Sequence, residues 1–329
     1  MRITILFGGS NKERLVSVAS AQALHRALPD AELWFWDVRD DVYRVRSEAL
    51  LGHARPFEDE FVPGGTGVTL ERALDAAKAE ERLLVLGLHG GRAENGELQA
   101  MCELRGIPFT GSGSAASHLA FDKVAAKRFA ALAGVNVPPG VALQDVDRAL
   151  AEHGRLIAKP SRDGSSYGLI FVNGTQDLVA VRAAAATEEY VIEPFVSGVE
   201  TTCGVLERAD GTVIALPPVE IVPAEGAFDY AAKYLAATTQ EICPGRFPPA
   251  IAARIMDDAL RAHRALSCRG YSRTDFIVSG EKPVYLETNT LPGLTAASLY
   301  PKALHAQGIG FSDFLRDQIA LAEKAIRQA

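Results

Sequence analysis

Cysteines and histidines are few in this chain, and neither residue type is clustered. The four cysteines show no spacing typical of a metal site, and the seven histidines form no cluster of the HxxxH type. These absences argue against a metal site built from these two residue types. They also predict ordinary reduced thiols, as in a cytosolic protein. The cysteines are Cys102, Cys203, Cys243 and Cys268.

Long apolar runs and blocks of like charge are also lacking. No stretch reaches the ~18 consecutive apolar residues of a membrane span, and residues 1–9 read as a short strand followed by glycines rather than a signal peptide. The net charge is −7, so broad attraction to nucleic acid or to an anionic membrane is not expected. We therefore expect a cytoplasmic protein with no membrane span and no nucleic-acid partner.

The composition is that of a soluble globular protein. The chain has 329 residues, of which 48% are hydrophobic and 23% charged. This length is too great for one ordinary core and suits two or three compact units.

The first third of the chain has the pattern of an α/β unit. Apolar runs at 2–7 and 83–88 are followed by glycines, and helical patterns occupy 17–28, 69–79 and 96–105. This alternation predicts βαβ units around a parallel sheet. Ligands of such sheets bind beyond the carboxyl ends of the strands. Gly8-Gly9 and His89-Gly90-Gly91 fall there.

The middle of the chain predicts a hairpin around a glycine–serine loop. A helix begins near Asp122, a plausible N-cap, and strands at 156–160 and 169–172 flank the loop at 161–168. A Walker-type loop needs a helix after its glycines, so a hairpin fits better. The loop suits phosphate, but a plain turn is the alternative. After about residue 196 the chain is strand-rich, with helices at 248–267 and 312–327.

Two runs in this last region, 270–275 and 286–293, carry the most informative chemistry. Residues two apart on a strand share a face, so Glu287 and Asn289 project together, as do Arg273 and Asp275. If the strands are neighbours, these groups form one patch of hard oxygen donors suited to Mg²⁺. A surface charge ladder is the alternative interpretation.

Other residues suit a nucleotide. Lys159 and Lys123 could supply charge to phosphates, although an isolated lysine is more often solvated surface. Residues 189–200 alternate apolar and polar side chains towards a glycine. Such an exposed edge suits a purine ring, and Glu200 suits ribose hydroxyls, but many strand–turn junctions look similar.

Taken in order, these motifs resemble the D-alanine–D-alanine ligase family of the ATP-grasp superfamily over essentially the full length. Each match is weak alone, whereas eight in the family's order are strong. The matching stretches are GGSNKER (8–14), HGG (89–91) with ENGELQ (94–99), FTGSG (109–113), DK (122–123), KP (159–160) with GSS (164–166), YAAKY (230–234) and the strand runs 270–275 and 286–293.

The resemblance implies a multidomain α/β and α+β architecture, the ATP-grasp fold with an amino-terminal, Rossmann-like parallel-sheet domain. It divides the chain into residues 1–121 with the first amino-acid subsite, 122–195 with the glycine–serine loop, and 196–329 with the metal and catalytic residues. It also implies a homodimer.

The implied activity is ATP-dependent ligation of two D-alanines for peptidoglycan synthesis. The first D-alanine carboxylate attacks the γ-phosphate of ATP, and the amine of the second attacks the resulting acylphosphate. Because an anion meets a polyanion, cations are required at the centre, and two Mg²⁺ ions, or Mn²⁺, are expected.

Residue by residue, the resemblance assigns roles. Glu13 holds the ammonium of the first D-alanine with His89 nearby, and Ser298-Leu299 receive the carboxylate of the second. Arg273 and the N–H of Gly293 stabilise the tetrahedral oxyanion. The metal ligands are Asp275, Glu287 and Asn289. The ATP-binding residues are Lys123, Lys159, Ser165, Ser166, Glu193, Phe195, Val196, Glu200 and Lys233.

A catalytic trio of Glu13, Ser165 and Tyr234 is implied to hold a closing lid over the site and so exclude water.

The chain departs from the family's pattern near the amino-acid subsites, at Leu15, Ala93, Asn95, Ala100 and Tyr167. These departures leave open a related ligase that joins other D-amino acids in a specialised pathway. A non-catalytic relative is disfavoured because every metal and lysine position is kept. No histidine lies between 154 and 262, which favours an amine acceptor.

Overall fold

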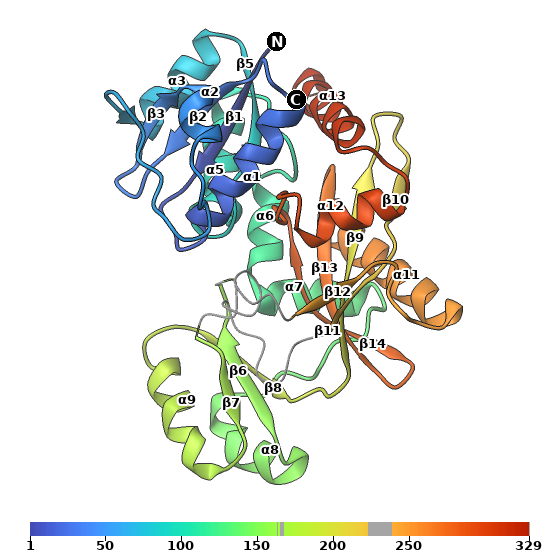
Figure 1. The fold of residues 1–329 in the computed structure, drawn as a ribbon. Coiled ribbons are helices and arrows are strands. Elements are labelled where there is room, and N and C mark those ends of the chain that lie inside the picture. The colour runs from blue at the N-terminus through green and yellow to red at the C-terminus, as the bar shows by residue number, and fades with distance from the viewer. Residues whose placement is uncertain (163, 165–167, 223–238, 329) are drawn as a thin grey trace.

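The structure is a computed structural model, and it describes residues 1–162, 164, 168–222 and 239–328. Its strands form a five-stranded, a three-stranded and a six-stranded sheet. In Figure 1 the amino-terminal sheet lies at the top, the six-stranded sheet in the middle and the three-stranded sheet at the bottom. The predicted mixture of α/β and α+β units is confirmed.

The amino-terminal sheet has the order β4-β3-β2-β1-β5. Its strands are β1 (Arg2–Gly8), β2 (Glu32–Trp36), β3 (Asp41–Val45), β4 (Val68–Thr69) and β5 (Arg82–Gly87). As predicted, β1 is parallel to its neighbours β2 and β5. Pairs β2–β3 and β3–β4 are antiparallel, an edge of the sheet that the sequence pattern did not predict.

A tight turn explains the antiparallel edge. The Asp37 side chain accepts hydrogen bonds from the N–H groups of Arg39 and Asp41, at 2.7 and 3.0 Å. Asp40 completes the turn with a φ of 65°. A link this short joins only antiparallel strands, because a parallel pair needs a long crossover. Helices α1 (Arg14–Ala27), α2 (Ser47–Leu51), α3 (Leu70–Ala79), α4 (Gly91–Glu94) and α5 (Glu97–Arg105) accompany this sheet.

The six-stranded sheet is antiparallel, with the order β12-β11-β9-β13-β14 and with β10 paired to β9. The predicted neighbours β13 and β14 pair directly, with Arg273 opposite Asn289 and Asp275 opposite Glu287. The register shifts just after Asp275. The strands are β9 (Val199–Glu207), β10 (Val213–Ala215), β11 (Val219–Val222), β12 (Gln240–Ile242), β13 (Tyr271–Ser279) and β14 (Lys282–Asn289).

The three-stranded sheet has the order β7-β6-β8 and confirms the predicted hairpin, because β6 (Leu156–Pro160) and β7 (Ile170–Val172) pair antiparallel. Strand β8 (Tyr190–Pro194) lies on the other side of β6. Helices α8 (Val146–His153) and α9 (Leu178–Ala185) close its own apolar core. Short 3-10 turns, η1 (Leu143–Asp145) and η2 (Thr175–Asp177), precede these helices.

The remaining helices join the units. Helix α7 (Lys123–Leu132) follows α6 (Ser114–Phe121) and contacts β14 and α11 (Pro249–Ala265). Its Ala130 belongs to the same apolar cluster as Phe276. This packing favours a central unit that begins after α7, and the division at 121 and 195 stays a prediction.

The carboxy-terminal helices pack against both the amino-terminal unit and the six-stranded sheet. Phe314 of α13 (Phe311–Gln328) lies against Tyr271, with ring centroids 5.3 Å apart. Tyr300 of α12 (Leu299–Ala306) donates a hydrogen bond to the carbonyl of Val205 at 2.8 Å. These residues belong to one core with β1 and β5. The two units that face the site therefore share a continuous apolar core.

No helix in the described ranges is long and apolar enough to cross a bilayer.

His263 gives the middle unit a defined pH dependence. The side chain lies buried between α11 and β13, with Nδ1 2.8 Å from Ser272 Oγ, and burial lowers its pKa from 6.5 to about 4. The unfolded chain therefore binds the proton first. This contribution to stability is complete above pH 6.5 and is lost as the pH falls towards 4.

We expect the free energy of unfolding to fall by about 2 kcal/mol between pH 7 and pH 5 from this group alone. Urea denaturation of wild type and His263→Gln at both pH values measures it, with His153→Gln, at an exposed position, as the control. An equal pH dependence in wild type and His263→Gln would contradict this prediction.

Candidate active site

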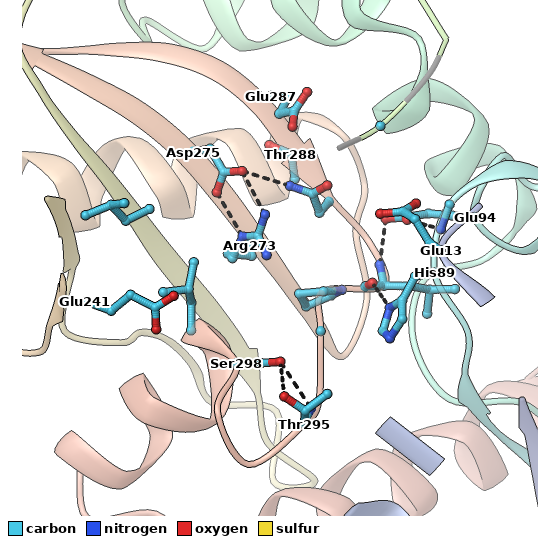
Figure 2. A pocket seen from close by; sticks show the side chains of 18 of the residues that line it. Glu13, His89, Glu94, Glu241, Arg273, Asp275, Glu287, Thr288, Thr295 and Ser298 are labelled. Carbon is cyan, nitrogen blue, oxygen red and sulfur yellow. Dashed lines mark hydrogen bonds and ion pairs between the residues drawn. The ribbon is translucent and has the colours of Figure 1, made fainter. Parts of the chain in front are cut away.

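Two cavities meet at Asp275 of β13 and Glu287 of β14, which pair across the two strands. The first measures about 330 Å³ and extends towards the amino-terminal unit, and the second measures about 890 Å³ and extends towards the three-stranded sheet. Figure 2 shows side chains that line the first cavity. The two cavities share part of their lining. The shared residues are Lys123, Gly164, Glu200, Ile221, Asp275 and Glu287.

The predicted patch on β13 and β14 exists, and Asp275 is its centre. Arg273 donates from Nε and Nη2 to the two Asp275 oxygens at 2.9 and 2.8 Å. Asn289 Nδ2 donates to Oδ2 at 3.2 Å, and Thr202 Oγ1 donates to Oδ1 at 2.6 Å. Figure 2 shows Glu287 beside this group. These four donors fix a buried carboxylate in one orientation.

Lys123 faces the patch from α7. Its ammonium lies 3.4 Å from Glu287 Oε2, and its side chain is buried. The helix is held in place because Asp122 caps it through the Ala125 N–H at 3.0 Å, as predicted. The Lys123 N–H also donates to the carbonyl of Ser161 at 3.0 Å, which ties the helix start to the end of β6. Lys123 is therefore a buried lysine that lines both cavities and not a solvated surface lysine.

A second lysine on the same helix was missed. Lys127 is buried and forms an ion pair with Glu193, whose other oxygen lies 3.9 Å from Lys159 Nζ. Burial, followed by the nearby Lys159 charge, lowers the pKa of Lys127 to about 8. The i, i+4 spacing from Lys123 puts both lysines on one helix face, and this signal could have identified it.

The second cavity contains most of the predicted nucleotide residues. It is lined by Lys159, Glu193, Phe195, Val196 and Glu200. Apolar side chains form much of its wall, with Phe171 and Phe195 centroids 6.1 Å apart. The Arg155 guanidinium lies 4.1 Å from the Phe195 ring centroid. An apolar wall beside lysine side chains suits a planar ring attached to an anion.

The first cavity contains the predicted amino-acid residues. It is lined by Glu13, His89, Arg273, Gly293, Ser298 and Leu299. The Glu13 carboxylate lies against Gly90, where a Cβ atom would come within 1.9 Å of Glu13 Oε2. Gly90 also has a φ of +61°. The positive φ favours glycine at this position, and any larger residue would displace the Glu13 carboxylate.

His89 is held on both ring nitrogens. Nδ1 lies 2.9 Å from the Leu291 carbonyl and Nε2 lies 2.8 Å from Ser20 Oγ. Burial lowers the pKa of the imidazole. The lowered pKa favours a neutral ring. Its two contacts join α1 to the segment after β14, so His89 shapes the cavity wall.

Glu94 was part of a quoted motif, but the sequence reading gave it no role. Its buried carboxylate accepts hydrogen bonds from the N–H groups of Gly90 and Leu291, at 2.9 and 2.8 Å. An ion pair between Glu241 and Lys302, also missed, borders the first cavity. Leu291 lies 197 positions from Glu94, and Lys302 lies 61 positions from Glu241, so no local pattern predicts these two contacts.

Five residues of interest lie outside the described residues and are not placed. They are Ser165, Ser166, Tyr167, Lys233 and Tyr234.

The donor set fits a hard divalent cation. In the described part of the chain no three histidine, cysteine or carboxylate side chains gather at one metal-binding point. Two carboxylates, Asp275 and Glu287, and the amide oxygen of Asn289 stand on adjacent strands instead. Mg²⁺ is commonly held by one or two carboxylates together with substrate phosphates. The site thus suits a cation that arrives with a phosphate ligand.

Comparisons with known proteins agree along the whole chain. A family model described as D-ala D-ala ligase N-terminus matches residues 2–112, and one described as D-ala D-ala ligase C-terminus matches residues 149–320. The D-alanine--D-alanine ligase of Desulforudis audaxviator is 37% identical, covering 98% of this chain and 99% of the relative. That of Oleidesulfovibrio alaskensis is 38% identical, covering 98% and 96%.

Solved structures give the same result. The VanG D-Ala:D-Ser ligase from Enterococcus faecalis superposes with a TM-score of 0.78 at 29% identity, covering 98% of this chain and 99% of that chain. The D-alanine--D-alanine ligase from Bacillus anthracis complexed with ATP superposes with a TM-score of 0.75 at 24% identity, covering 100% and 99%. The second likeness concerns the fold alone.

The buried ion pair of Lys127 with Glu193 leads to a prediction about stability. Lys127→Met leaves the Glu193 carboxylate buried, with Lys159 at 3.9 Å as its remaining ion-pair partner, so we expect a loss of about 3–5 kcal/mol in the free energy of unfolding. Arg128→Met, at an exposed position of the same helix, should change it by less than about 0.5 kcal/mol. Urea denaturation measures both. A loss in Lys127→Met below about 1 kcal/mol would refute the assignment.

Proposed function

The chain belongs to the D-alanine–D-alanine ligase family, and from this premise we propose how its two cavities join two D-alanines with ATP to make D-alanyl-D-alanine for peptidoglycan. The proposal rests on one observation above all. One cavity is lined by residues predicted to bind ATP and the other by residues predicted to bind D-alanine. The two cavities share Lys123, Asp275 and Glu287. A phosphoryl group that passes from one ligand to the other must cross that shared wall.

ATP takes the second cavity. The adenine lies against the apolar wall near Phe195 and Val196, and Glu200 accepts hydrogen bonds from the ribose hydroxyls. Lys159 and Lys123 stand where the phosphates approach the shared wall. The described part of the glycine–serine loop borders both cavities at Gly164, which supports a role for this loop as a phosphate cover.

The two D-alanines take the first cavity. The Glu13 carboxylate, seated against Gly90, holds the ammonium of the first. Ser298 and Leu299 stand at the start of α12, where backbone N–H groups and the helix dipole favour the carboxylate of the second. Arg273 and Gly293 line the same cavity, where we assign the Arg273 side chain and the Gly293 N–H to the oxyanion.

The reaction then proceeds in two steps, formation of an acylphosphate and formation of the amide. A carboxylate oxygen of the first D-alanine attacks the γ-phosphorus, and the bond to the bridging oxygen breaks to release ADP. The amine of the second D-alanine attacks the acyl carbon, loses a proton, and phosphate leaves as the amide forms. Arg273 is held by Asp275 beside this carbon and donates to the oxyanion of the tetrahedral intermediate.

Two Mg²⁺ ions belong to this proposal, and when bound they would neutralise charge on the phosphates of ATP. Asp275, Glu287 and Asn289 would hold them, and Mn²⁺ suits the same oxygen donors. The trio of Glu13, Ser165 and Tyr234, with Ser166 and Lys233 at the nucleotide, completes the proposal as a lid that keeps water from the acylphosphate. A cytoplasmic location and a homodimer are likewise proposed from the family.

A substrate panel tests the proposal. Phosphate release from ATP and Mg²⁺ is measured with D-alanine, D-serine, other D- and L-amino acids and D-lactate. We expect turnover with D-alanine to exceed turnover with every other pair. Arg273→Ala, run in parallel, should lower kcat by about 10²- to 10³-fold, because an oxyanion donor is lost.

The other outcomes are distinct. Preference for another D-amino acid would replace D-alanine with a specialised substrate, and D-lactate turnover would contradict the amine acceptor. ATP binding without turnover for any pair would contradict the ligase assignment. Near wild-type rates in Arg273→Ala would contradict the catalytic role of that residue.

A further inference from the structure

The segment that follows β14, residues 290–293, carries the proposed oxyanion donor Gly293 and is held from the amino-terminal unit. Leu291 is its central contact residue. The Leu291 carbonyl lies 2.9 Å from His89 Nδ1, and its N–H donates to Glu94 Oε1 at 2.8 Å. His89 lies in the loop after β5 and Glu94 is the last residue of α4, so both partners are about 200 residues earlier in the chain.

Glu94 joins the two sides of the first cavity. Its Oε2 accepts the N–H of Gly90 at 2.9 Å, while Oε1 accepts the N–H of Leu291 and lies 3.5 Å from Thr290 Oγ1. The side chain is buried, with 7% of the residue exposed. One carboxylate thus fixes the glycine against which Glu13 rests and the segment that carries Gly293. Figure 2 shows Glu94 beside His89 and Glu13 at one side of the cavity.

Ser20 supports the same segment from α1. Its hydroxyl lies 2.8 Å from His89 Nε2 and accepts the Leu294 N–H at 3.3 Å. Glu94 thus binds Leu291 within residues 290–293, and Ser20 binds Leu294, the residue directly after them. Both side chains are buried and come from the amino-terminal unit. A hydrophobic contact would hold the units together equally well, but it would not set the direction of backbone N–H groups.

We propose that Glu94 is a positioning residue for the ligation step, which aligns the backbone of residues 290–293 so that the Gly293 N–H points at the tetrahedral intermediate. This inference rests on the proposed function for its kinetic part and on the contacts alone for its structural part. Glu94 touches backbone on both sides and acts through Gly90 and Leu291.

Glu94→Gln separates positioning from packing, because its shape is nearly unchanged. The amide offers one oxygen, so either the Gly90 or the Leu291 N–H must face an NH₂ group instead of an acceptor. Glu97→Gln is the matched control, because this nearby carboxylate is exposed and pairs with Arg92. It should behave as wild type in every measurement below.

The kinetic readout is the ratio of phosphate released to dipeptide formed. In wild type and Glu97→Gln the ratio should be close to one. In Glu94→Gln we expect kcat for dipeptide to fall about 10- to 100-fold, as for a slightly misplaced catalytic group, with the KM for ATP within about twofold. The ratio should rise above one, because the acylphosphate still forms and is then lost to water. A ratio of one with an unchanged kcat would overturn the proposal.

Hydrogen–deuterium exchange tests the structural part without any activity. The amide hydrogens of Thr290, Leu291 and Gly293 should exchange at least about tenfold faster in Glu94→Gln than in Glu97→Gln. Unchanged exchange would overturn the inference, even in an active enzyme. Inactivity of the wild type would instead contradict the proposed function. The exchange result would then decide alone whether Glu94 positions residues 290–293.

Ser20→Ala gives a second route if Glu94→Gln does not fold. It removes the hydroxyl that accepts the Leu294 N–H on the other side of the same segment. The proposal predicts the same rise in the ratio of phosphate to dipeptide, and a folded Ser20→Ala protein with a ratio of one overturns it.

Discussion

The antiparallel pairing of β13 with β14 is the constraint on which the site depends. It sets Asp275 opposite Glu287 and Arg273 opposite Asn289 on one face of the sheet. Because side chains alternate along a strand, a slip of one residue would turn these groups to the other face. Thr202 on β9 hydrogen-bonds to Asp275 from the other neighbouring strand. The chemistry of the site is therefore a consequence of sheet register.

Charge balance explains why a polyanion suits this place. Lys123, Lys127, Lys159 and Arg273 surround the shared wall, and the carboxylates they contact are Glu193, Asp275 and Glu287. These side chains are largely buried, where unbalanced charge is costly. Phosphate oxygens arriving with a divalent cation satisfy both kinds of group at once. The proposed binding of ATP with a divalent cation rests on this balance of buried charges.

Local patterns predicted what depends on neighbours in sequence. The Asp122 cap, the hairpin of β6 and β7 and the convergence of Arg273 with Asp275 all follow from spacing, and the structure has each of them. What escaped prediction depends on distant contacts. Glu94 meets Leu291 across 197 positions, and Lys302 meets Glu241 across 61. No periodicity encodes such pairs. The antiparallel edge at β3 was missed because its short Asp37 turn was not recognised.

Metal binding at the β13–β14 patch tests the central claim most directly. Mn²⁺ is titrated into the protein with a non-hydrolysable ATP analogue, and bound ions are followed by electron paramagnetic resonance. Glu287→Gln should weaken Mn²⁺ binding by at least about tenfold. Glu281→Gln, an exposed carboxylate at the turn between the same strands, should not change it. Equal Mn²⁺ affinity in wild type and Glu287→Gln would contradict the account.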